Sequence, residues 1–79
     1  MITVCFNSEL QKFTGIEQVK LEVHSYRELV AMLSDAYGIN RELLMDMAVA
    51  IDGLIVHEPF LEKFANGSEI HFMHRISGG

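Results

Sequence analysis

The chain has 79 residues, 49% of them hydrophobic, and a formal net charge of −5. This length fits one small domain, and the scattered basic residues do not form the basic patch that binding to nucleic acid requires. No apolar run approaches the ~20 residues of a membrane-spanning helix, and the N-terminal residues have no signal-peptide pattern. A single cysteine fits a reducing compartment. We therefore expect a cytoplasmic globular protein that binds neither nucleic acid nor membranes.

Alternating hydrophobicity predicts two strands near the beginning of the chain. Residues 1–7 carry apolar side chains at every second position, and residues 17–23 repeat this pattern. The polar stretch Asn7–Gly15 between them suits a hairpin connection. We expect the two strands to pair antiparallel.

The period then changes to that of a helix over residues 26–37. Ser25 and Glu28 form a capping box at its start, because the serine can accept from free backbone N–H groups and the glutamate can reach back. Apolar side chains follow at helical spacing. Gly38 is a natural stop, since glycine adopts a positive φ without a Cβ clash.

Short elements fill the second half of the chain. In order, they are a helical turn at 40–44, strands at 47–51 and 54–56 around an Asp52-Gly53 turn, a helical turn at 58–64, a turn at 66–68 and a last strand at 69–75. This order predicts an α+β fold, with a mixed sheet of four to five strands and one main helix packed on one face. We expect the first strand (Ile2–Asn7) and the last (Glu69–Arg75) to pair in parallel at the sheet centre.

The chain ends in Ser77-Gly78-Gly79. Glycine has no side chain to pack and the greatest backbone freedom, so this end is expected to be a thin, flexible tether carrying a carboxylate. Such a tether can enter a narrow channel and reach a bound nucleotide, as an enzyme that activates a protein terminus with ATP requires. The alternative is an ordinary frayed terminus.

Three segments carry a resemblance to a known family. Ile51-Asp52-Gly53 is similar to a strand-ending V-N-G turn, the segment 64–70 to an L-x-D-G-D-E-V entry into the last strand, and the segment 76–79 to a terminal V-A-G-G. Over its whole length the chain thus resembles the ubiquitin-like β-grasp sulfur carriers of the MoaD and ThiS family, and its length favours the MoaD branch. MoaD proteins commonly carry two prolines where this chain has His74 and Arg75.

The resemblance implies a β-grasp domain over residues 1–75 and a flexible tail over 76–79. The Gly79 carboxylate would be adenylated, converted to a thiocarboxylate and used to donate sulfur in cofactor or metabolite biosynthesis, with molybdopterin the favoured product. The tail residues expected to contact partners are Met73, His74, Arg75, Ile76, Ser77 and Gly78.

The implied chain is a carrier or non-catalytic subunit, not an enzyme, and binds no cofactor itself. Its implied partners are an adenylating enzyme of the ubiquitin-activating type, which uses ATP, and a desulfurase or rhodanese-like sulfur donor. A catalytic subunit such as the large subunit of molybdopterin synthase is a further possible partner.

Other reactive side chains have structural interpretations. Cys5 has no basic neighbour in sequence to lower its pKa, so we expect a structural cysteine. The four histidines form no i, i+4 pair and have no second cysteine beside them, so we expect no metal site.

Phe60, Leu61 and Phe64 are expected to close the core, with room for one of them in an exposed patch.

Two other functions share these features. The same Gly-Gly end would serve a protein modifier that is joined to lysines through Gly79. A structural or assembly β-grasp domain would need no chemistry at that end. No paired carboxylates, Ser/His/Asp arrangement or phosphate-binding glycine loop points to an independent enzyme.

Overall fold

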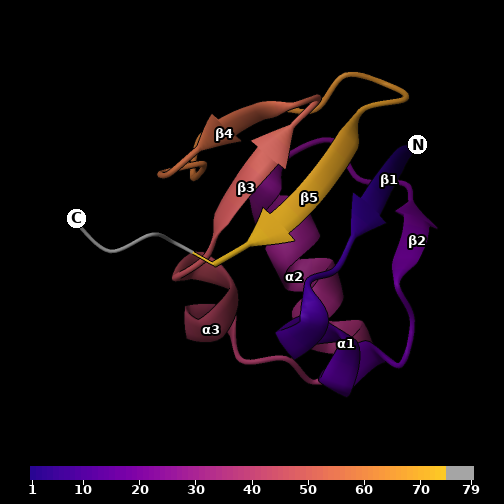
Figure 1. Cartoon of the computed structure of the whole chain (residues 1–79). Helices are drawn as coiled ribbons and strands as arrows, with labels where there is room; N and C mark the ends of the chain where they lie inside the picture. Colours follow the sequence, from indigo (N-terminus) through magenta and orange to yellow (C-terminus); the bar gives the residue numbers. More distant parts are fainter. Residues whose placement is uncertain (75–79) are drawn as a thin grey trace.

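The computed structural model describes residues 1–74, which form a five-stranded mixed sheet and three helices (Figure 1). In chain order the elements are β1 (Ile2–Cys5), α1 (Ser8–Thr14), β2 (Gln18–Leu21), α2 (Tyr26–Tyr37), α3 (Arg41–Met45), β3 (Ala48–Ile51), β4 (Leu54–Val56) and β5 (Glu69–Met73). The strand order across the sheet is β2-β1-β5-β3-β4. This architecture is a β-grasp-like α+β fold, as the sequence predicted.

The two central strands come from opposite ends of the described chain. β1 and β5 pair in parallel, with Val4 opposite Ile70, and every other strand pair is antiparallel. Residues that lie opposite each other on neighbouring strands face the same side of a sheet. Val4 and Ile70 therefore point to the same side, and both are fully buried in the core. The predicted parallel pairing of the first and last strands is confirmed.

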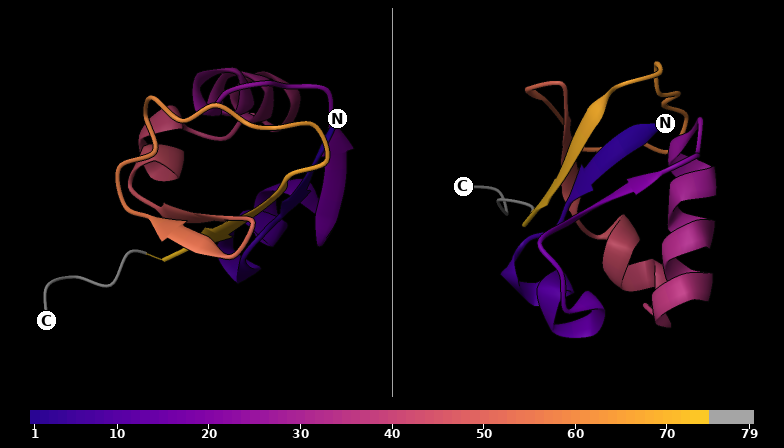
Figure 2. Two further views of the ribbon diagram at one scale, coloured as in Figure 1. Left: turned by 90° about the horizontal axis from the view of Figure 1, so that it is seen from above. Right: turned by 90° about the vertical axis from the view of Figure 1, so that its right-hand side faces the viewer.

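α2 covers the core face of the sheet, and Figure 2 shows the two as separate layers. The Ser25 side chain accepts from the Glu28 N–H at 3.2 Å, and the Glu28 carboxylate accepts from the His24 N–H at 2.6 Å. Gly38 ends the helix with φ 68°. The helix therefore has the predicted bounds, since both ends are capped locally.

The core lies between α2 and the inward side of the sheet. Its fully or nearly fully buried side chains are Ile2, Val4, Leu10, Tyr26, Leu29, Leu33, Ile39, Leu44, Val49, Ile70 and Phe72. Each side chain of this size contributes about 1.5–3 kcal/mol when it is removed from water. The core is thus enclosed by the predicted apolar stripe of the helix on one side and by the inward-facing side chains of β1 and β5 on the other.

The segment between β1 and β2 differs from the prediction. Instead of a simple hairpin connection it contains α1, whose N-cap Asn7 accepts from the Leu10 N–H at 2.9 Å and whose C-cap Gly15 has φ 73°. Leu10 is fully buried, so this short helix is held by one anchored side chain and two caps. β1 and β2 still pair antiparallel, with Val4 opposite Val19.

The second half of the chain follows the predicted order, with one difference. A β3–β4 hairpin forms around Asp52 and Gly53, both at positive φ. The predicted helical turn at 58–64 is only a single turn, closed by the Glu62 N–H donating to the Pro59 carbonyl. The next backbone groups leave the helical path because the Glu62 carbonyl accepts from the N–H of Tyr26, the first residue of α2, and the Phe64 N–H donates to the His24 carbonyl just before α2. Phe64 is also buried.

Candidate functional site

Two of the residues expected to carry the function, Met73 and His74, lie at the end of β5. Met73 is the last residue of β5, pairs with Ala48 of β3 and is half-buried. His74 follows it and is exposed. The other predicted tail residues, Arg75, Ile76, Ser77, Gly78 and Gly79, lie outside the described residues.

The sheet fixes the position from which the chain leaves β5. β5 is bonded on one side to β1 and on the other to β3, and Ile70 and Phe72 bury their side chains in the core. A strand held by two ladders and a core face cannot shift register without moving its apolar side chains to the solvent face. Met73 is therefore held in place by a strand that is paired on both sides.

α1 contributes a side chain to this end of the sheet. β1 and β5 both run toward the end where α1 and α3 lie (Figure 1). Glu9, in the first turn of α1, places Oε2 3.8 Å from Nδ1 of His74. The sequence did not predict this contact, because the polar stretch 7–15 was interpreted as a hairpin connection, although Asn7 and Gly15 are the caps of a short helix.

The outer face of the sheet, away from α2, carries an apolar strip on one side. Met73 lies beside Ala48, and Ala50 lies beside Ile55 of β4. We call Ala48, Ala50, Ile55 and Met73 the outer apolar strip. Ile55 is 52% exposed and Met73 is half-buried, whereas Ala48 and Ala50 are buried, so the accessible apolar surface of the strip comes from Met73 at the end of β5 and from Ile55 on β4.

The loop before β5 adds a separate apolar side chain. Of the three residues expected to close the core, Phe64 is buried and Phe60 is partly buried, whereas Leu61 is 87% exposed. The prediction that one of them lies on the surface is thus confirmed. Leu61 follows Pro59 in the loop and is not part of the outer apolar strip.

Polar side chains occupy the centre of the same outer face. Cys5 of β1 lies opposite His71 of β5, and Glu69 lies two residues before His71 on the same face. Nε2 of His71 is 2.6 Å from Oε1 of Glu69, and the Cys5 thiol donates to Oε1 of Gln18 at 3.7 Å. Among the described residues, Cys5, Glu69 and His71 form a group whose potential ligand atoms all lie within 4.8 Å of one another.

The environment of Cys5 disfavours its thiolate. Partial burial, followed by the negative charge of the nearby Glu69, raises the pKa of the Cys5 thiol. The group remains a neutral thiol near pH 7 and is a poor nucleophile in this state. This agrees with the sequence-based view of a structural rather than a sulfur-transferring cysteine.

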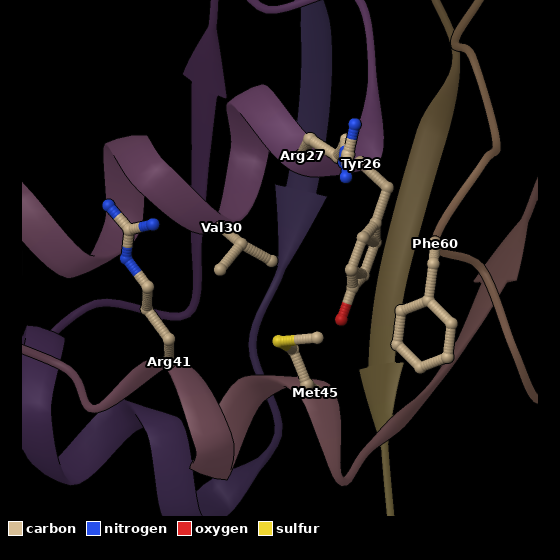
Figure 3. Close-up of a pocket in the computed structure, with 6 residues that line it drawn as sticks. All are labelled: Tyr26, Arg27, Val30, Arg41, Met45 and Phe60. Atoms are coloured by element: carbon tan, nitrogen blue, oxygen red, sulfur yellow. The ribbon is translucent and has the colours of Figure 1, made fainter.

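A shallow pocket lies on the helical side of the molecule (Figure 3). It has a volume of about 250 Å³ and is lined by Tyr26, Arg27, Val30, Arg41, Met45 and Phe60. Tyr26 and Phe60 meet edge to face with ring centroids 6.0 Å apart. Ligand pockets usually measure about 300–1,000 Å³, so this pocket is a small recess with two arginines at its sides.

Comparison with known proteins leaves the family open. No protein-family model matches the chain, and no curated protein matches it either. None of the helices in the described part of the chain has the length and hydropathy needed to cross a bilayer. The fold, the motifs of the sequence and the geometry at the end of β5 are therefore the features that bear on function.

Proposed function

We propose that this chain is a sulfur-carrier protein whose Gly79 carboxylate is adenylated, converted to a thiocarboxylate and used to donate sulfur, with a molybdopterin precursor as the acceptor. The observation that carries the proposal is the central, parallel position of β5 beside β1. That strand leads directly into the segment with the Ser77-Gly78-Gly79 sequence. A rigid domain followed by a narrow glycine segment is the arrangement that delivery of a terminal group requires.

The chemistry needs activation because a carboxylate is a poor electrophile. A Gly79 oxygen attacks the α-phosphorus of ATP, pyrophosphate leaves, and a mixed anhydride with AMP forms. A persulfide sulfur from the donor enzyme then attacks the carbonyl carbon, and AMP leaves. A thiol of the donor system reduces the resulting acyl disulfide, which frees the thiocarboxylate. The carrier contributes positioning to each step, since its docked domain holds the reacting atoms close together.

The partners follow from this sequence of reactions. The adenylating enzyme supplies the ATP site, and the carrier needs a surface that docks on it beside the tail. The outer apolar strip lies next to the end of β5, and apolar side chains at the centre of an interface contribute most of its affinity. The net charge of −5 favours a partner with a basic rim, because complementary charge speeds association.

Two variants of the tail test the proposal. Deletion of Gly79 removes the reacting group, and Gly78→Val adds a branched side chain where a narrow channel admits only backbone. With the adenylating enzyme, ATP and a sulfur donor, we expect the wild-type chain to gain a terminal thiocarboxylate and both variants to gain none. Both should melt at the wild-type temperature, because the described core lies within residues 1–74.

Intact mass with and without an alkylating reagent measures the outcome. Exchange of one terminal oxygen for sulfur, with alkylation at Gly79, supports the carrier. A chain that only ever carries its plain carboxylate under these conditions contradicts the proposal. Recovery of Gly79 joined to lysines of other proteins would identify a protein modifier, and full activity of the Gly79 deletion in cells would identify a structural domain.

A further inference from the structure

The tertiary structure brings together three side chains that are distant in the sequence. β1 and β5 lie side by side at the centre of the sheet (Figure 1). Their parallel register sets Cys5 opposite His71, and Glu69 shares the same outward face because side chains repeat every second residue along a strand. A thiol, an imidazole and a carboxylate thus converge on one spot with ligand atoms within 4.8 Å.

This donor set is that of a zinc site. Zn²⁺ binds thiolate sulfur, imidazole nitrogen and carboxylate oxygen, and open sites use three protein ligands with water in the fourth position. Mg²⁺ and Ca²⁺ prefer all-oxygen surroundings, which one carboxylate does not supply. One thiolate and one carboxylate also balance the two charges of the ion, with a neutral imidazole completing the set.

The geometry requires only small side-chain movements. Donor atoms around tetrahedral zinc lie roughly 3.3–3.8 Å apart, from zinc–ligand bonds of about 2.0–2.3 Å. Nε2 of His71 and Oε1 of Glu69 are 2.6 Å apart and must separate slightly, and the sulfur of Cys5 lies within 4.8 Å of both side chains' ligand atoms. The side chains of Glu69 and His71 are 58% and 46% exposed, so they can rotate, while the two bonded strands hold the backbone.

We propose that Cys5, Glu69 and His71 bind one Zn²⁺ ion on the outer face of β1 and β5, with water as the fourth ligand. Binding releases the proton of the Cys5 thiol to solvent, and the positive ion reverses the effect of the local negative charge on that group. The site lies entirely within the described residues. It is separate from the tail chemistry and does not depend on the proposed function.

A second histidine–glutamate pair in the same molecule supplies a matched control. His24 and Glu22 are also two residues apart, and Nε2 of His24 is 3.7 Å from Oε1 of Glu22. Both side chains are exposed, and the pair belongs to no group of three potential metal ligands found among the described residues. A site that depends on convergence with Cys5 must therefore bind metal at His71 and not at His24.

The test uses Co²⁺ as a spectroscopic probe of the zinc position. The full-length chain is reduced, stripped of metal with a chelator, desalted and titrated with Co²⁺, after which Zn²⁺ is added. We expect one Co²⁺ per chain, a thiolate-to-cobalt charge-transfer band in the near-ultraviolet, and loss of the band when Zn²⁺ displaces Co²⁺. The apparent molecular mass of the chain in solution should not change when the metal is added.

Variants assign the ligands. Cys5→Ser should abolish the charge-transfer band, and Cys5→Ala serves as a second variant if the serine chain folds poorly by circular dichroism. Glu69→Gln and His71→Gln should each weaken Co²⁺ binding at least about tenfold, since even changes beyond the direct ligands cost 10–100-fold in metal affinity. His24→Gln should bind as the wild type does.

Several outcomes overturn the proposal. The site does not exist if the wild-type chain shows no charge-transfer band, or if His71→Gln retains wild-type affinity. Equal weakening by His24→Gln would show that the metal binds at the other pair. One ion per two chains would replace the single-chain site with a bridge between copies.

Discussion

Asp52 shows how one residue joins two parts of the sheet. It occupies the turn between β3 and β4 at φ 50°, where most residues with a Cβ are strained. Its Oδ1 accepts from the Glu69 N–H at 2.9 Å, and its own N–H donates to the Glu69 carbonyl at 2.9 Å. The β3–β4 turn is thereby tied to the start of β5.

Asp52→Ala tests this role. The alanine loses the side-chain hydrogen bond and tolerates a positive φ less well, so we expect a loss of about 1–2 kcal/mol in the free energy of unfolding. Asp52→Asn is the matched control, because asparagine keeps an acceptor oxygen and adopts positive φ readily. Urea denaturation measures both variants, and equal stability of the alanine and asparagine chains would show that the tie contributes nothing.

Cys5 provides a test of local electrostatics. Because burial and Glu69 raise the pKa of the thiol, the thiolate fraction near pH 7 is smaller than in an unstructured peptide. Iodoacetamide should therefore alkylate the folded, metal-free chain more slowly than a cysteine peptide, with the rise in rate displaced to higher pH.

Glu69→Gln isolates the electrostatic part of this effect. Removing the negative charge lowers the thiol pKa toward its ordinary value, so alkylation at a given pH should become faster. The urea-unfolded chain is the reference, since it removes the contribution of burial as well. A folded chain that reacts as fast as the peptide would contradict the assigned environment of Cys5.

At the scale of elements, α1 is the feature that sequence patterning did not predict. Residues 8–14 have no sustained apolar period, and Leu10 is their only fully buried side chain. The Asn7 cap and the Gly15 stop are local signals, but an isolated helix of this length is unstable in water. It forms because Leu10 enters a core assembled by distant strands.

Leu10→Ala tests this explanation. Removing a fully buried leucine side chain should cost about 2–5 kcal/mol of unfolding free energy, a large part of the stability of so small a domain. Phe13→Ala is the control within the same helix, because Phe13 is 49% exposed. Thermal denaturation separates the two, and similar losses in both variants would show that α1 is not anchored through Leu10.

The sequence predicted α2 but not α1, and this difference has a physical reason. Ser25, Glu28 and Gly38 mark the ends of α2 by local bonds, and a helix of three turns repeats its apolar period often enough to be read. The segment 58–64 has a proline and apolar residues typical of a helical turn, yet two of its backbone groups bond to His24 and Tyr26 at the start of α2. Long-range partners decided the conformation of that segment.

At the scale of the whole molecule, the sheet presents two different faces. The inner face is covered by α2 (Figure 2), while the pairing register places the outer apolar strip and the polar group of Cys5, Glu69 and His71 on the outer face. The end of β5 lies at the edge of this outer face. A partner that receives the tail and contacts the strip at the same time would hold the carrier in one orientation.

Ile55→Lys tests the docking face. The charge disrupts an apolar contact and opposes a basic partner rim, so the KM for adenylation should rise at least about fivefold, as for a residue that contributes more than 1 kcal/mol at an interface. Lysine is well tolerated on an edge strand such as β4, and the melting temperature should change little.

Leu61→Lys is the matched control for this variant. Leu61 is more exposed than Ile55, at 87%, but lies in the loop before β5 and outside the strip. Its KM should stay at the wild-type value. A rise of equal size in both variants would indicate a general effect of charge and would place the docking surface elsewhere.

The sequence by itself determined the order of the five strands and of α2, the bounds of α2, the β3–β4 turn and the parallel pairing of the first and last strands. These follow from local periodicity, caps and turn residues, and from the few ways a short chain can cover one sheet with one helix. Only the tertiary structure decided the helix at 8–14, the path of residues 58–64, the contact of His74 with Glu9 and the convergence of Cys5 with His71. Each depends on the register between segments far apart in the chain, and register is fixed by burial of the whole core rather than by any local pattern.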